Sequence, residues 1–120
     1  MTNEVLLDTS FILTCIKQKI DFLEGLLLMG YKSLIPNQVI KELEGLSKSN
    51  DNAKTALKIL NSNKTYYKII NLEGKNTDNA IINYTKENPK TAIGTLDREI
   101  KKAVKNNKIV IRGKKRLEVI

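Results

Sequence analysis

Short apolar runs of strand length alternate along this chain with segments in which apolar residues recur at helical spacing. The pattern predicts strands at Val5–Leu7, Tyr31–Ile35, Tyr66–Leu72, Thr91–Gly94 and Ile109–Ile111, with a short edge strand at Leu117–Ile120. Strands that alternate with helices indicate an α/β domain with a parallel sheet, and right-handed crossovers place helices on both faces of it. We therefore expect one α/β domain over residues 1–120.

The first strand runs directly into an acid and two hydroxyl residues, Asp8, Thr9 and Ser10. Thr9 or Ser10 can cap the helix that follows at once. Asp8 then lies at the C-terminal end of a buried strand, where open α/β sheets bind their ligands. A cap alone would also explain an acid here, so a function for Asp8 depends on whether other acids share its edge of the sheet.

A second candidate acid lies on the helix predicted between Pro36 and Leu46. Val39, Leu43 and Leu46 form one apolar stripe on that helix. Glu42 lies on the flank of the stripe, at the border of the core, whereas Glu44 points to solvent. Glu42 is therefore the better candidate for a site.

Two further acids, Asp78 and Asp97, lie where later helices begin. Thr77 can cap the first of these helices, and an acid in a first turn is also favoured by the helix dipole alone. In a parallel sheet, however, Asp8, Asp78 and Asp97 fall on the same edge, and Glu42 can reach that edge from its helix. Carboxylates that converge repel each other unless protons or metal ions neutralise them.

Composition limits the chemistry that such a cluster can perform. The chain has no histidine and one cysteine, Cys15, which lies in an apolar helical stretch and is expected to be buried. Ser-His-Asp and Cys-His catalysis and structural zinc sites are therefore excluded. A metal would have to be held by oxygen, which points to Mg²⁺ or Mn²⁺. The chemistry that fits is phosphodiester hydrolysis, in which a bound metal lowers the pKa of water and stabilises the leaving oxygen.

Four segments, in this order and spacing, resemble the PIN-domain nucleases over almost the whole chain: Leu6–Ser10, Val39–Leu43, Thr77–Ile81 and Ala92–Asp97. The resemblance implies a three-layer α/β/α sandwich around a central parallel sheet of four to five strands. It also implies Mg²⁺- or Mn²⁺-dependent cleavage of RNA. The metal-site and catalytic acids that it implies are Asp8, Glu42, Asp78 and Asp97, with Thr9, Ser10 and Thr95 as supporting polar residues.

The sequence departs from the family pattern at two positions. Many members have Asn where this chain has Ser10, and a further acid where it has Asn79. The missing acid implies one tightly held metal, or a second one recruited only with the substrate.

Two branches of the family are candidates. The segment Ile111–Leu117 and the compact chain resemble the archaeal nucleases that process precursors of small-subunit ribosomal RNA. VapC-type toxins, which cut transfer or ribosomal RNA and are held inactive by an antitoxin, are the next closest. A PIN-like module that binds RNA or protein without cutting is less favoured because all four acids are present. A receiver-like phosphotransfer domain also clusters acids at strand ends, but the order of the acids here fits it poorly.

The charge balance favours a polyanionic partner such as RNA. The chain has 21 Lys and Arg against 13 Asp and Glu, a net charge of +8, and nearly half of these cations lie between residues 98 and 116. A solvated lysine-rich surface is the simpler explanation for such a segment. Arg98, Lys101 or Lys102, and Lys105 recur at helical spacing, so we expect them to share a face of the last helix. Gly113 allows a tight turn among the cations that follow the fifth strand. The RNA-binding residues that we expect are Arg98, Lys101, Lys102, Lys105, Arg112, Lys114, Lys115 and Arg116.

The early helices, Phe11–Ile16 and Phe22–Met29, carry more apolar surface than one buried stripe needs, above all in the run Leu26–Met29. We expect part of this surface to contact a second copy of the chain or another protein. No apolar run reaches membrane-spanning length, and the first residues lack the pattern of a signal peptide. We therefore expect a cytoplasmic protein without a membrane partner.

Overall fold

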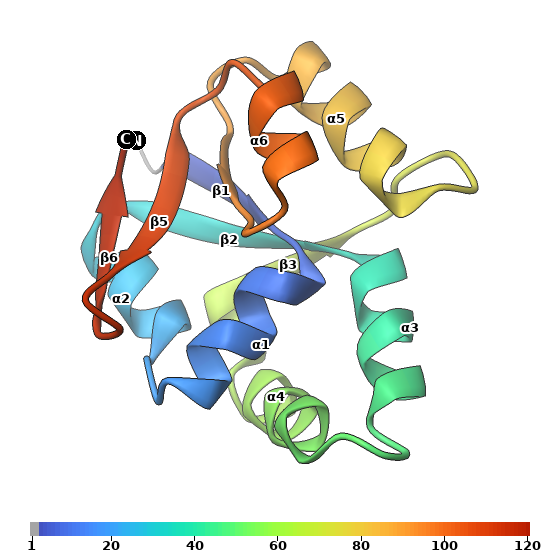
Figure 1. The fold of residues 1–120 in the computed structure, drawn as a ribbon, viewed down its shortest axis with the longest axis vertical. Helices are drawn as coiled ribbons and strands as arrows, with labels where there is room; N and C mark the ends of the chain where they lie inside the picture. The colour runs from blue at the N-terminus through green and yellow to red at the C-terminus, as the bar shows by residue number, and fades with distance from the viewer. Residues whose placement is uncertain (1–2) are drawn as a thin grey trace.

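A computed structural model describes residues 3–120 as a six-stranded sheet in the order β3-β2-β1-β4-β5-β6 (Figure 1). Five of the strands are parallel, and β6 pairs with β5 in the antiparallel direction. The strands are β1 (Asn3–Leu7), β2 (Tyr31–Pro36), β3 (Tyr67–Ile70), β4 (Ala92–Gly94), β5 (Lys108–Arg112) and β6 (Arg116–Val119). Residues 1 and 2 of the expected domain lie outside the described part.

Helices cover both faces of this sheet, which gives the three layers that the family resemblance implies (Figure 1). Helices α5 (Thr77–Glu87) and α6 (Arg98–Ala103) lie on one face. The other face carries α1 (Thr9–Lys17), α2 (Phe22–Leu28), α3 (Asn37–Leu46) and α4 (Asp51–Ser62), and a 3-10 turn, η1 (Lys64–Tyr66), leads from α4 into β3. The predicted α/β fold is thus confirmed, with β6 as the expected edge strand.

Two apolar cores form because successive side chains of β1 point to opposite faces of the sheet. Val5 and Leu7 pack with the helices α1 to α4, while Leu6 packs against Ile81 of α5 and Ile100 of α6. All three β1 side chains are fully buried. Strand β1 therefore lies at the centre of the domain, and the residue that follows it emerges from a strand packed on both faces.

The strand order reverses at β1, which has β2 on one side and β4 on the other. Gly94, the last residue of β4, pairs with Leu7, and the backbone N–H of Asp8 donates to the Gly94 carbonyl oxygen at 3.2 Å. An added Cβ at Gly94 would lie 2.8 Å from Leu7 Cδ2 and 3.3 Å from ring carbons of Phe11. Glycine is needed here so that β4, β1 and α1 can pack closely beneath Asp8.

Two predicted helix caps were wrong by one residue. Asp8 itself, rather than Thr9 or Ser10, is the N-cap of α1, because its carboxylate accepts the Phe11 N–H. Asn76 rather than Thr77 caps α5. In both cases the actual cap is a short polar side chain one position earlier than predicted. The preference for such residues at an N-cap does not distinguish between two adjacent ones.

Helix α6 is also shorter than predicted. It ends at Ala103, and its C-cap residue Val104 already has an extended backbone. Lys105 therefore lies beyond the helix. The spacing predicted that it would share a helical face with Arg98, and this prediction was wrong. The C-terminal tight turn occurs where Gly113 was expected to allow it, since Gly113 and Lys114 both have positive φ angles.

Cys15 is a buried free thiol, as predicted, and burial raises its pKa to about 12. Within residues 3–120, none of the helices has the length and apolar character needed to cross a membrane.

Candidate active site

A cleft of about 310 Å³ opens at the edge of the sheet where β1 ends. It brings together side chains from α1, α3 and α5 and from the residues that cap α1 and α6. All four predicted acids line it, although they come from segments spread over most of the chain. The lining residues are Asp8, Thr9, Ser10, Leu13, Glu42, Thr77, Asp78, Ile81 and Asp97.

Asp8 is the most firmly held of the four acids, with only 7% of its surface exposed. One carboxylate oxygen accepts the Phe11 N–H at 3.0 Å and the Ser10 hydroxyl at 2.9 Å. The other oxygen accepts the Thr95 hydroxyl. Asp8 therefore caps α1 and also lines the cleft, so its capping role is compatible with a place in the predicted site.

Asp97 is linked to Asp8 through Thr95. The Asp97 N–H donates to the Thr95 hydroxyl oxygen at 3.0 Å, and this hydroxyl donates in turn to Asp8. The Asp97 carboxylate caps α6 by accepting the N–H groups of Glu99 at 2.8 Å and Ile100 at 3.3 Å. The Ser10 hydroxyl oxygen accepts the Leu96 N–H at 3.2 Å, which ties the same loop to α1.

Glu42 reaches the cleft from α3 and accepts a hydrogen bond from the Thr9 hydroxyl. Glu44, two positions further, lines a different hollow beside Leu57 of α4. The structure thus places the two glutamates on different sides of α3, as the position of the apolar stripe predicts. All three predicted supporting residues, Thr9, Ser10 and Thr95, donate to an acid of the cleft.

The surroundings in the cleft raise the pKa values of two of its acids, Asp8 and Asp78. Burial raises the pKa of Asp8, and the charge of Asp97 adds to this, while hydrogen bonds from Thr95, Phe11 and Ser10 oppose it. Burial also raises the pKa of Asp78, and the charges of Asp97 and Glu42 raise it further. Within the described chain, neither Lys nor Arg lines the cleft to offset this repulsion.

The donor set suits a hard divalent cation, because every charged group that lines the cleft is a carboxylate and carboxylate oxygen is the ligand that Mg²⁺ and Mn²⁺ prefer. The side chains are not drawn together around one point: over residues 3–120, no three acids approach closely enough to form a ready-made metal site. The cleft therefore has the chemistry for a metal, with the acids spread around its walls.

Three lining residues lay outside the predicted site: Leu13, Thr77 and Ile81. Helical spacing could have found two of them, since Leu13 is four positions after Thr9 and Ile81 is three after Asp78. The sequence predicts Thr77 as a helix cap, and in the structure its neighbour Asn76 has that role.

The eight predicted RNA-binding residues lie outside the cleft, in two separate groups. Arg98, Lys101 and Lys102 are on α6, with Lys105 just after it, and Lys101 is half-buried. The second group lies at the β5–β6 turn, which Figure 1 shows beside α2, away from α6. Its members, Arg112, Lys114, Lys115 and Arg116, are all exposed, and Arg112 pairs with Glu118 at 3.3 Å.

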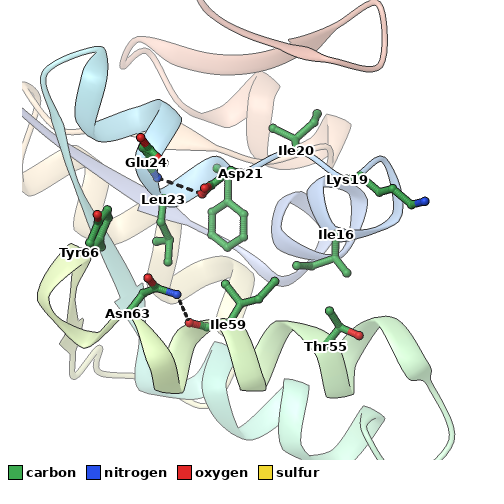
Figure 2. A pocket seen from close by; sticks show the side chains of 11 residues that line it. Ile16, Lys19, Ile20, Asp21, Leu23, Glu24, Thr55, Ile59, Asn63 and Tyr66 are labelled. Atoms are coloured by element: carbon green, nitrogen blue, oxygen red, sulfur yellow. Dashed lines mark hydrogen bonds between the residues drawn. The ribbon is translucent and has the colours of Figure 1, made fainter.

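A larger groove of about 420 Å³ lies elsewhere, between the α1–α2 connection and α4 (Figure 2). Its walls are mainly apolar, with Ile16, Leu23 and Ile59 among them. Its acid Asp21 accepts the Glu24 N–H at 3.2 Å and so caps α2. This groove lacks the converging acids of the cleft and offers an apolar surface instead.

Comparison with known proteins identifies the family of this chain. The family model described as "PIN like domain" matches residues 5–116, and the chain belongs to this family. The chain is 33% identical to ribonuclease VapC4 from Methanocaldococcus jannaschii, over 93% of this chain and 92% of that protein. Its fold is similar to the structure of the PIN domain endonuclease Utp24, with a TM-score of 0.80 and 24% identity over 98% of this chain and 92% of the other.

Proposed function

We propose that this protein is an endoribonuclease that hydrolyses RNA phosphodiester bonds with the help of Mg²⁺ or Mn²⁺. The observation that carries the proposal is that Asp8, Glu42, Asp78 and Asp97 all line one cleft. Membership of the PIN-like family and the similarity to a protein named as a ribonuclease support it.

The same four acids would hold the metal, which when bound supplies a water of lowered pKa and offsets charge on the reacting phosphate. The rest of the site keeps these acids in place. Ser10 and Thr95 fix the Asp8 carboxylate, and Thr9 fixes Glu42. Asn79, where many family members carry a further acid, is exposed and does not line the cleft. We therefore propose one resident metal, with any second ion arriving with the substrate.

We propose precursors of small-subunit ribosomal RNA as the substrate, because Ile111–Leu117 resembles the ending of the archaeal processing nucleases. A specific observation favours a second candidate. The relative that is 33% identical over nearly the whole chain is a VapC ribonuclease, which supports a toxin that cuts transfer or ribosomal RNA. Both substrates are cytoplasmic RNAs, so we propose the cytoplasm as the location.

One assay tests the activity and separates the two roles. Purified protein is incubated with Mn²⁺, Mg²⁺ or EDTA and with fragments of small-subunit precursor and transfer RNA side by side. We expect cleavage with metal and none in EDTA. Specific cuts in the precursor support processing, and specific cuts in transfer RNA support the toxin. RNA binding without cleavage under all conditions would reject the nuclease in favour of a non-catalytic module.

We further propose that a second copy of the chain packs against α2. Leu27 and Leu28 are 44% and 81% exposed, and Leu27 lies one turn beyond Leu23, which lines the apolar groove. Burial of this surface in a dimer would remove it from water. Light scattering should show a dimer for the wild type and a monomer for the double variant Leu27→Ser, Leu28→Ser. A strictly monomeric wild type at high concentration would reject the dimer.

A further inference from the structure

Three residues with side-chain hydroxyls line the cleft, and they are used differently. The Thr9 hydroxyl donates to Glu42 and the Ser10 hydroxyl donates to Asp8. Thr77 lines the same cleft, and in the described part of the chain its hydroxyl forms no hydrogen bond with another protein group. It is therefore the one hydroxyl among the described lining residues that does not hold an acid in place.

The Thr77 hydroxyl is not used as a helix cap, because the preceding residue, Asn76, caps α5. The Asn76 side-chain oxygen accepts the Asn79 N–H at 3.0 Å, and the Asn76 carbonyl oxygen accepts the Ala80 N–H at 3.0 Å. A threonine at the first helical position next to a satisfied cap has no structural need for its O–H group. Its hydroxyl remains available to a molecule in the cleft.

Because the cleft is lined by acids, an RNA phosphate that enters it needs hydrogen-bond donors. An RNA phosphate that enters meets four carboxylates, and the lining residues include neither Lys nor Arg in the described chain. Thr9 and Ser10 already donate to acids, which leaves Thr77 as the side-chain donor not yet committed. A hydrogen bond to a charged oxygen is stronger than one between neutral groups, so a single uncharged donor matters here.

We propose that the Thr77 hydroxyl donates a hydrogen bond to a non-bridging phosphate oxygen of the RNA and so positions the strand in the cleft. This inference rests on the proposed ribonuclease function and adds a positioning residue to it. It assigns no proton transfer to Thr77, whose role is to hold the substrate.

The test compares Thr77→Val, which keeps the shape and removes the donor, with Thr77→Ser, which keeps the donor. Steady-state cleavage of one RNA with Mn²⁺ should show a KM raised roughly tenfold for Thr77→Val, with a smaller change in kcat. Thr77→Ser should stay within about threefold of the wild type. Thr55→Val is the matched control, since Thr55 is exposed on α4 and lines the other groove (Figure 2).

Binding separates phosphate from the alternatives. A fluorescently labelled single-stranded RNA and the DNA of the same sequence are titrated against Asp8→Asn protein with and without Thr77→Val. Equal weakening for both nucleic acids supports a phosphate contact, and weakening for RNA alone overturns it in favour of the ribose 2′-hydroxyl. If the wild type cleaves RNA and Thr77→Val has the same KM and kcat, the proposed role of Thr77 is rejected and the proposed ribonuclease function stands. A wild type that cleaves no RNA rejects the proposed function itself.

Discussion

The hydroxyl of Thr95 donates to the carboxylate of Asp8 across 87 positions of sequence. The same oxygen accepts the Asp97 N–H at 3.0 Å, so one side chain sets the positions of two acids. The bond crosses from the loop after β4 to the end of β1, next to the backbone hydrogen bond between Asp8 and Gly94. The geometry of the cleft therefore depends on how these two strands meet.

Replacement of Asp8 should separate activity from stability. Asp8→Asn should abolish cleavage, because it removes a charge from the proposed metal site. It should leave the metal-free melting temperature equal or higher, since an Asn also caps a helix and removes a carboxylate whose pKa is raised by burial and, in addition, by the charge of Asp97. Cleavage assays and thermal melts in EDTA measure the two effects.

Asp21→Asn is the matched control for this change, because Asp21 caps α2 through the same kind of bond but lies outside the cleft. It should cleave RNA like the wild type. An Asp8→Asn protein that retains full activity would refute the proposed role of the acids.

Substitutions of the two glutamates of α3 should have different effects on cleavage. Glu42→Gln should lose most of the cleavage activity, because Glu42 lines the cleft. Glu44→Gln should behave like the wild type, because Glu44 lines a hollow beside α4. The two substitutions make the same chemical change, so each serves as the control for the other in single-turnover assays. Equal losses of activity would show that the position of Glu42 in the cleft is not what cleavage depends on.

The packing at Gly94 predicts an effect on stability. Gly94→Ala places a Cβ against Leu7 and Phe11, both fully buried, and should lower the free energy of unfolding by about 1–3 kcal/mol. Gly45→Ala in α3 meets no atom within 4 Å and should raise the free energy of unfolding by about 0.5–1 kcal/mol. Urea denaturation measures both, and a Gly94→Ala protein as stable as the wild type would contradict the close packing beneath Asp8.

The cationic β5–β6 turn predicts a change in how salt affects RNA binding. A variant with Arg112, Lys114, Lys115 and Arg116 changed to Gln should bind RNA more weakly, and the dependence of log affinity on log salt should become shallower. Each phosphate of a single strand that the variant no longer neutralises should reduce this slope by roughly 0.7. Titrations in the Asp8→Asn background at several salt concentrations measure it.

A second variant, with Arg98, Lys102 and Lys105 changed to Gln, tests the group near α6 separately. The structure places the two groups apart, so RNA that follows only one path should respond to only one variant. An unchanged affinity and slope in both variants would leave these residues with a role in solubility alone.

The fold could be predicted because its signals are local. The apolar run Val5–Leu7 and the stripe around Leu43 reflect burial on one or both sides, which the sequence shows directly. The four acids could be found because each lies where a helix begins or beside an apolar stripe. Their order also matches a known family pattern.

The remaining features depend on distances that no local pattern contains. Helix α6 ends at Ala103, before Lys105 is reached. The β5–β6 turn lies beside α2 and away from α6 (Figure 1). Asp8 and Asn76 cap their helices one residue before the predicted positions. Which of two adjacent polar residues becomes the cap depends on where the backbone changes from extended to helical angles. Leu13 and Ile81 look like ordinary core residues in the sequence because the cleft borders the core.

The four acids belong to segments that meet only when the sheet is complete, so an unfolded chain holds them far apart. A divalent ion would then bind the native state and scarcely the unfolded one, and ion concentration would act on the folding equilibrium. At one hundred times its dissociation constant, such an ion adds about 2.7 kcal/mol to the free energy of unfolding. The supply of the ion would therefore set how long the protein survives proteolysis as well as how fast it cuts.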